Sequence, residues 1–275
     1  MLAKIIGKID LLIFNNLLVN RILILFGKDD LIKLKSAYWA RKNFYSIHAL
    51  SYDPNKSVIE NAGYTNHPEI IESVYKQRKR FSEYAHKQLK PQQEVLDIGC
   101  GTGYFMDLFP EYVKVNGIDL NIKFLEIAKE GNPNANLYYG NYFNYNFQKQ
   151  FDLIYLFGVM MYFEPSKLKD FFKRSHELLK ENGILYFQYQ HAVSYLDLYY
   201  PDLSYVKYSP AVMTKHAAKY FEIEVHEHAF DGRKFNDYDR NPHYFPDGTE
   251  RRTDTNMNNY LMIARKKKLV GESRN

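Results

Sequence analysis

Residues 95–104 read VLDIGCGTGY, and this stretch decides the fold of the chain. The apolar residues around Asp97 are typical of a strand that is buried on both faces. Gly99, Gly101 and Gly103 follow at once, and glycines let the backbone turn sharply and approach a ligand without an intervening side chain. The stretch therefore predicts a buried parallel strand that runs into a nucleotide-binding turn.

The spacing of the glycines distinguishes between two kinds of nucleotide site. A dinucleotide fingerprint has the pattern G-x-G-x-x-G, and its third glycine would fall where this chain has Tyr104. The pattern is instead D-x-G-x-G-x-G, which resembles motif I of the class I (Rossmann-like) S-adenosylmethionine (SAM) dependent methyltransferases. This resemblance implies an α/β fold with a doubly wound, seven-stranded, mostly parallel sheet, and SAM as the cofactor.

Three later segments extend the resemblance. A strand over 113–118 leads to Asp119, about 20 residues after the loop, where a ribose-binding acid belongs. A strand over 136–139 is followed by Asn141, where the family often has an Asp that contacts the adenine amino group. The Asn carbonyl can accept the same hydrogen bond, and an ordinary turn Asn is the alternative. Residues 151–163 (FDLIYLFGVMMYF) resemble motif IV, with Tyr162 at one of two positions that are often His.

The resemblance implies a set of cofactor contacts along these segments. We expect them at Asp97, Gly99, Cys100, Gly101, Gly103, Asp119, Leu120, Asn141, Tyr142 and Leu156. An upstream helical segment usually closes over the cofactor in this family, so Tyr64, Arg78 and Arg80 are further candidates, and Arg80 is expected to face the methionine carboxylate. The alternative for Arg80 is an exposed helix residue within the basic run 76–80.

The remaining elements follow the order that the fold requires. We expect a helix over 165–180, a tight turn at 181–183, a strand over 184–187, a helix over 209–219, and strands over 221–229 and 258–264. Upstream helices are expected over 39–50 and 69–89, with Asn66 as a cap and Pro68 in the first turn of the second.

These elements predict a division of the chain. Residues 1–28 form a hydrophobic and basic helical arm, 29–90 a helical extension over the cofactor site, 91–266 the SAM-binding methyltransferase domain, and 267–275 a basic tail. Within the domain, residues 190–209 and 230–256 are expected to be insertions on the substrate side, the first of them rich in Tyr.

Positive charge is concentrated at the two ends of the chain. The formal net charge of the 275 residues is +5, and residues 1–42 and 251–275 each carry +5, so the body between them carries −5. A nucleic-acid enzyme would place positive charge beside the active site, so nucleic acid is disfavoured as a partner. Basic ends favour contact with an anionic surface, and a solubilising tail is the alternative. The single cysteine, Cys100, excludes a disulfide within the chain, favours a cytoplasmic compartment and is expected only to pack.

The first 26 residues have apolar residues at helical spacing, but charged and Asn residues interrupt them. They are too polar for a spanning helix, and no small-residue cleavage site of a secretory signal follows. Three interpretations remain: an arm that packs on the core or on a partner subunit, an interfacial membrane helix, and an anchor. Localisation is therefore expected to be cytoplasmic, with membrane association as a possible addition.

His191 is the expected base for methyl transfer, because it follows the fifth strand and its unperturbed pKa near 6.5 suits proton removal. Tyr162 and Glu164 are the second choices, whereas His226 and His228 are expected to be structural or solvent-facing. A plain loop histidine is the alternative for His191.

Motifs that the chain lacks narrow the range of methyl acceptors. The sequence 157–160 (FGVM) replaces the Asn/Asp-Pro-Pro-aromatic motif of enzymes that methylate base amino groups, and it offers no acid for a metal. We therefore expect O-methylation of a small molecule or glycan, without a metal. The alternatives are methylation of a membrane-associated lipid or quinone headgroup, and a SAM-binding module without transferase activity.

Overall fold

The structure is a computed structural model, and it describes residues 52, 53, 55–61, 68–163, 165–190, 208, 210–229 and 259–268. The predicted arm at 1–28, the helix at 39–50 and most of both insertions lie outside these residues. In chain order the helices are α4 (Val58–Asn61), α5 (Pro68–Gln88), α6 (Ile122–Gly131), α7 (Leu168–Leu178) and α9 (Pro210–Ala217), with 3₁₀ turns η1 (Met106–Leu108), η2 (Met160–Tyr162) and η3 (Pro165–Lys167). The strands are β1 (Glu94–Ile98), β2 (Lys114–Asp119), β3 (Asn136–Tyr139), β4 (Phe151–Leu156), β5 (Leu179–Gln190), β6 (Phe221–His228) and β7 (Asn259–Lys266).

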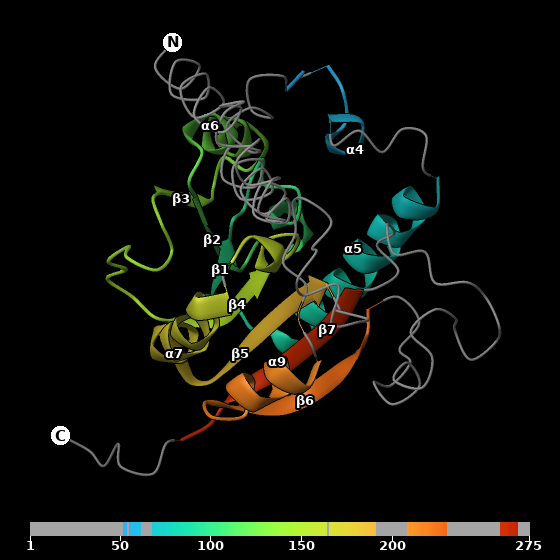
Figure 1. The fold of residues 1–275 in the computed structure, drawn as a ribbon. Coiled ribbons are helices and arrows are strands. Elements are labelled where there is room, and N and C mark those ends of the chain that lie inside the picture. Colours follow the sequence, from blue (N-terminus) through green and yellow to red (C-terminus); the bar gives the residue numbers. More distant parts are fainter. Residues whose placement is uncertain are drawn as a thin grey trace, which may run out of the picture.

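The strands form one seven-stranded sheet in the order β3-β2-β1-β4-β5-β7-β6 (Figure 1). The first five strands in this order are parallel, and β7 runs antiparallel to both β5 and β6. The order reverses between β1 and β4, which is the switch point of a doubly wound sheet. The predicted fold class is therefore confirmed.

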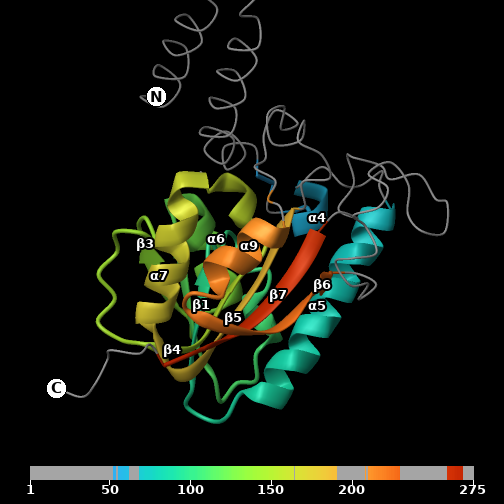
Figure 2. The same cartoon turned by 60° about the horizontal axis from the view of Figure 1, so that its bottom comes forward.

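Helices cover both faces of this sheet, and Figure 2 shows α5 on one side with α7 and α9 on the other. Alternate residues of the central strands face opposite layers because the side chains of a strand alternate. On β4, Ile154 packs with Phe171 of α7, whereas Tyr155 packs with Phe81 of α5. The Phe81 ring centroid lies 4.8 Å from those of Tyr155 and Tyr186. Helix α5, predicted as an extension, is thus also a layer of the α/β body.

The fifth strand begins five residues earlier than predicted. Leu179 is fully buried and pairs with Phe151, and the next paired residues are Leu153 and Ile184, so the ladder shifts register between them. The residues of the predicted turn, 181–183, lie within β5 at this register shift. Asn182 keeps a turn conformation with φ of 60°. Helix α7 begins three residues later than predicted, because the 3₁₀ turn η3 occupies residues 165–167. The other elements for which bounds were predicted differ from them by no more than two residues at each end.

All three glycines of the loop after β1 have left-handed backbones, and the last two differ in their surroundings. The φ angle is 53° at Gly101 and 78° at Gly103. A Cβ atom added at Gly103 would lie 2.6 Å from Asn132 Nδ2 and 3.2 Å from Ala128 Cβ, whereas one added at Gly101 would meet no described atom within 4 Å. Gly103 is therefore required by packing against α6, and Gly101 leaves open space above the loop.

We predict that Gly103→Ala destabilises the protein more than Gly101→Ala. The left-handed conformation costs either alanine about 1–2 kcal/mol, and the contacts with Asn132 and Ala128 add to the cost at position 103 alone. Urea unfolding of the two variants measures the difference. Equal losses of unfolding free energy would contradict the packing role of Gly103.

Candidate active site

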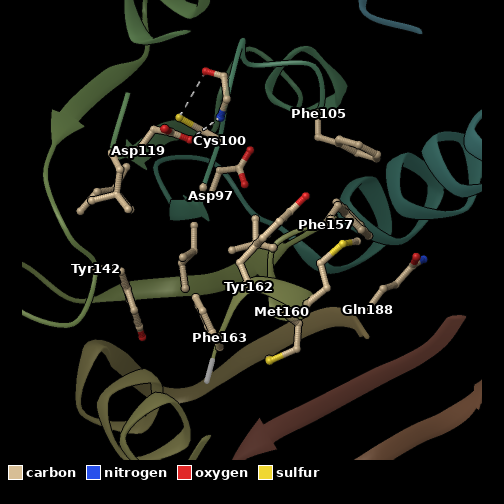
Figure 3. Close-up of a pocket in the computed structure, with 18 of the residues that line it drawn as sticks. Asp97, Cys100, Phe105, Asp119, Tyr142, Phe157, Met160, Tyr162, Phe163 and Gln188 are labelled. Atoms are coloured by element: carbon tan, nitrogen blue, oxygen red, sulfur yellow. Dashed lines mark hydrogen bonds between the residues drawn. The ribbon is translucent and has the colours of Figure 1, made fainter. Parts of the chain in front are cut away.

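A cavity of about 810 Å³ opens where the parallel strands end. It is lined by the loop after β1, the end of β2, the loop after β3, the segment that follows β4, and the last residues of β5. In Figure 3, Cys100, Asp97 and Asp119 lie at one end of the cavity and Tyr142 and Phe163 at the other. Ligands of open α/β sheets bind outside the carboxyl ends of the strands at the switch point, which is the position of this cavity.

The carboxylate of Asp119 fixes the glycine loop. Its Oδ2 atom accepts a hydrogen bond from the Gly101 amide at 2.9 Å, and its Oδ1 atom accepts one from the Asn121 amide at 2.8 Å. The Asn121 side chain in turn caps α6 by accepting from the Lys123 and Phe124 amides. Burial raises the pKa of Asp119, although these backbone donors oppose the rise. One carboxylate thus joins the end of β2, the loop after β1 and the start of α6.

A second carboxylate, that of Asp97, lines the same end of the cavity and is almost completely buried. Burial raises its pKa to about 8, and the nearby Asp119 contributes to the rise. Asp97 is therefore largely protonated at neutral pH, and a cation bound in the cavity would favour its ionised form.

The side chain of Cys100 packs against the sheet. A Cβ atom at Gly117 on β2 would lie 2.8 Å from Cys100 Sγ, so the thiol occupies the space above that glycine. Burial also raises the pKa of the thiol. The expected packing role fits this position, and the backbone at Cys100 remains a lining element of the cavity.

Leu120 and Asn141 lie on the rim near Asp119. Leu120 lines the cavity with 68% of its surface exposed, although it is a large apolar side chain. Asn141 Oδ1 accepts from the Phe143 amide at 2.9 Å, which is a turn-capping contact, and a carbonyl oxygen has a second lone pair for a ligand. Exposed apolar surface beside a polar acceptor is suited to a flat heterocycle such as adenine.

Three of the residues expected to contact the cofactor do not line this cavity. Gly103 packs behind the loop, and Leu156 is fully buried in the sheet. Arg80 forms an ion pair with Glu227 and donates to the Ala229 carbonyl at 3.1 Å, so its guanidinium is directed toward β6. Arg80 is thus paired with the carboxylate of Glu227 and not directed at the position expected for the methionine carboxylate of the cofactor.

Two neighbouring residues of α5 approach the site instead. Arg78 donates to both oxygens of Asp107 at 2.8 and 3.0 Å, and its guanidinium carbon lies 4.1 Å from the ring centroid of Tyr104, which lines the cavity. Gln77 donates to Gln188 Oε1 at 2.7 Å, and both side chains line the cavity. Arg78 was a candidate from the sequence, whereas Gln77 carried no motif that could single it out.

The candidate bases are divided between described and undescribed residues. Tyr162 lines the cavity, whereas His191, Glu164 and Tyr64 lie outside the described residues. His226 contacts the Tyr189 hydroxyl at 2.5 Å and Thr214 Oγ1 at 3.2 Å. His228 is buried. Both histidines of β6 are thus held within the protein, as their structural interpretation expects.

The far end of the cavity is aromatic and apolar. Phe143, Met160, Met161 and Phe163 line it, together with Tyr142. Val159 also lines the cavity, but its side chain lies against Gly99 of the glycine loop. The Tyr142 hydroxyl is bonded to Ser175 Oγ at 2.9 Å and points into the core, and burial raises its pKa. Phe157 stacks on Phe105 with ring centroids 4.2 Å apart, which closes the side toward α5.

Two features are absent from the part of the chain that the structure describes. Within it, no three His, Cys, Asp or Glu side chains come together as a metal-binding group. None of its helices has the length and apolar character needed to cross a membrane.

Comparisons with known proteins agree with this geometry. A family model described as "Methyltransferase domain" matches residues 95–183, and one described as "Protein-L-isoaspartate(D-aspartate) O-methyltransferase (PCMT)" matches residues 45–135. The chain is 29% identical over 164 residues to malonyl-[acyl-carrier protein] O-methyltransferase 1 of Ilyobacter polytropus, which covers 53% of this chain and 59% of that protein. It is 31% identical over 118 residues to a putative methyltransferase of Geobacillus sp., covering 40% and 46%. The chain thus spans about half the length of the curated relatives it matches.

A solved structure shares the fold. The N-methyltransferase NodS from Bradyrhizobium japonicum, in complex with S-adenosyl-L-homocysteine, superposes with a TM-score of 0.58 at 13% identity, covering 85% of this chain and all of that one. The strand order, the glycine loop with its bracing carboxylate and the matched domain together show that the chain belongs to the class I S-adenosylmethionine-dependent methyltransferases, with SAM as its cofactor.

Proposed function

We propose that this protein transfers the methyl group of SAM to an oxygen atom of a small molecule or glycan. The observation that carries the proposal is a single cavity with two different ends. Asp97, Asp119 and the glycine loop line one end, and an aromatic compartment formed after β3 and β4 lines the other. One cavity can therefore hold a cationic nucleoside donor and an acceptor side by side.

The residues at the acidic end fit SAM. Asp119 has lone pairs left for ribose hydroxyls after its two backbone contacts, because a carboxylate offers about four acceptor sites. The open space above Gly101 lets a ligand approach the backbone. Leu120 and Asn141 supply an apolar surface and an acceptor for the adenine, and the Asp97 carboxylate favours a positively charged ligand.

SAM supplies an activated methyl group, so the protein needs to position the acceptor in line and to remove a proton where the acceptor is a hydroxyl. Correct positioning alone can lower a barrier substantially. The aromatic compartment would orient the acceptor through packing, and closure by Phe105 and Phe157 would limit the access of water. We assign proton removal to His191, with Tyr162 and Glu164 as the alternatives.

Transfer to oxygen is supported by the name of the Ilyobacter relative, which is an O-methyltransferase. The solved structure described above is an N-methyltransferase, but at 13% identity its similarity shows only the fold. A SAM-binding module without transferase activity is the contrasting hypothesis. Tight SAM binding without turnover on any phenol, sugar, lipid or quinone acceptor would support that module.

Asp119→Ala is predicted to weaken SAM binding by about 10- to 100-fold, because hydrogen bonds to a charged group contribute about 1.5–3 kcal/mol. The change also removes the acceptors of the Gly101 and Asn121 amides. Asp119→Asn is the matched control: it retains one acceptor and should give an intermediate loss. Calorimetric titration with SAM, with circular dichroism to check folding, measures both. Unchanged SAM affinity in Asp119→Ala would reject the role.

SAM affinity is predicted to rise with pH between 6 and 8. The free protein keeps Asp97 protonated in this range because its pKa is about 8, and a cationic ligand favours the carboxylate, so binding releases a proton. The affinity should then rise by at most about tenfold per pH unit and level off above the pKa. Titrations in buffers of different ionisation enthalpy detect the released proton. Asp97→Asn should remove the pH dependence, and a flat profile in the unmodified protein would contradict the argument.

His191→Ala is predicted to lower kcat by about 10²–10⁴-fold with little change in SAM affinity, since this is the usual contribution of a general base. Tyr162→Phe should have a smaller effect. Formation of S-adenosylhomocysteine with a panel of phenols and sugars provides the assay. A larger loss in Tyr162→Phe would transfer the role to Tyr162. Unchanged kcat in both variants and in Glu164→Gln would rule out a side-chain base among these three.

A further inference from the structure

We propose that the methyl acceptor combines an apolar, preferably aromatic, body with an anionic oxyacid group, and that Lys167 binds this group at the rim of the cavity. The inference rests on the proposed function, because it concerns the acceptor end of the same cavity. Lys167 is the last residue of η3 and directly precedes α7. Among the described residues that line the cavity, it is the one Lys or Arg.

The charges that line the cavity are separated. The Asp119 carboxylate lies at the end formed by β1 and β2, beside Asp97, which ionises when a cationic ligand binds. Lys167 belongs to the segment after β4. A cavity with acidic groups at one end and a cation at the other favours ligands of opposite charge at the two ends. The cationic donor is drawn to the carboxylates, and an anionic acceptor is drawn to Lys167 and away from them.

Lys167 is available to a ligand. Its Nζ atom lies 3.5 Å from Asp170 Oδ2, and the two side chains are 51% and 56% exposed. Exposed ion pairs of this kind contribute little, because water screens them and both side chains lose freedom in forming them. An anion that enters the cavity and is partly desolvated there would compete effectively with Asp170.

An aromatic wall stands next to this cation. Lys167 Nζ lies 6.0 Å from the ring centroid of Phe143, which packs edge-on against Phe163 with centroids 5.0 Å apart. The Phe163 carbonyl accepts from the buried Tyr208 hydroxyl at 2.6 Å, which fixes that end of the wall. Aromatic faces and edges bind flat apolar groups well. The ligand that fits both features is an amphipathic anion.

The test uses the fluorescent anion 1-anilinonaphthalene-8-sulfonate and its uncharged relative N-phenyl-1-naphthylamine, titrated into the full chain with S-adenosylhomocysteine present and absent. Lys167→Gln should weaken binding of the sulfonate about fivefold, with the neutral probe unaffected. Lys167→Arg should restore the affinity. Asp170→Asn should strengthen sulfonate binding, because it removes the competing carboxylate.

Lys169→Gln is the matched control, because Lys169 carries the same charge two residues from Lys167 but does not line the cavity. Displacement of the probe by benzoate or by phenyl phosphate then distinguishes a carboxylate from a phosphate as the preferred anion. Equal sulfonate binding by Lys167→Gln and the unmodified protein, an equal loss in Lys169→Gln, or an equal loss for the neutral probe would each overturn the proposal. Failure of S-adenosylhomocysteine to bind would instead overturn the proposed function. The two outcomes can be distinguished, because the effect of Lys167→Gln on probe binding is also measured without S-adenosylhomocysteine.

Discussion

The contact between the Asp119 carboxylate and the amides of Gly101 and Asn121 is the constraint on which the site depends. The loop after β1 has left-handed glycines, and its first two amides donate to the Ile118 carbonyl of β2, whereas the Gly101 amide needs another acceptor. The Asp119 carboxylate, at the end of the neighbouring strand, supplies that acceptor and links the loop to the start of α6. The same group faces the cavity, so the element that shapes the loop also presents its remaining lone pairs to a ligand.

Much of the fold could be predicted because its signals are local. The apolar run before Asp97, the glycines after it and the strand that ends at Asp119 each lie within a few residues of sequence, and their order fixes the topology of a doubly wound sheet. The start of β5 was missed for the opposite reason. Leu179 joins the sheet because it pairs with Phe151, a contact between distant residues, and no local pattern distinguishes it from the end of a helix.

The two arginines of the basic run 76–80 show where sequence reasoning about the site reaches its limit. Residues two positions apart on a helix point about 200° away from each other, so Arg78 and Arg80 cannot serve the same site. The sequence favoured Arg80, but the structure directs Arg80 to Glu227 and Arg78 to Asp107 beside Tyr104. Which of them faces the glycine loop depends on how α5 is rotated against the sheet. That rotation is set by the burial of Phe81 among distant rings.

The two ends of the cavity also differ in how they are encoded. The donor end consists largely of backbone and of two carboxylates, Asp97 and Asp119, that lie on adjacent strands and close together in the sequence, so a short motif can specify it. The acceptor end draws Phe143, Phe163, Lys167, Tyr189 and Asn259 from four separate parts of the chain. Its shape depends on side-chain packing across the whole sheet, and each of these residues can change without disturbing the glycine loop. A family can therefore keep one donor while its members diverge in acceptor, and the charge and aromatic character of this end carry the information about what the protein methylates.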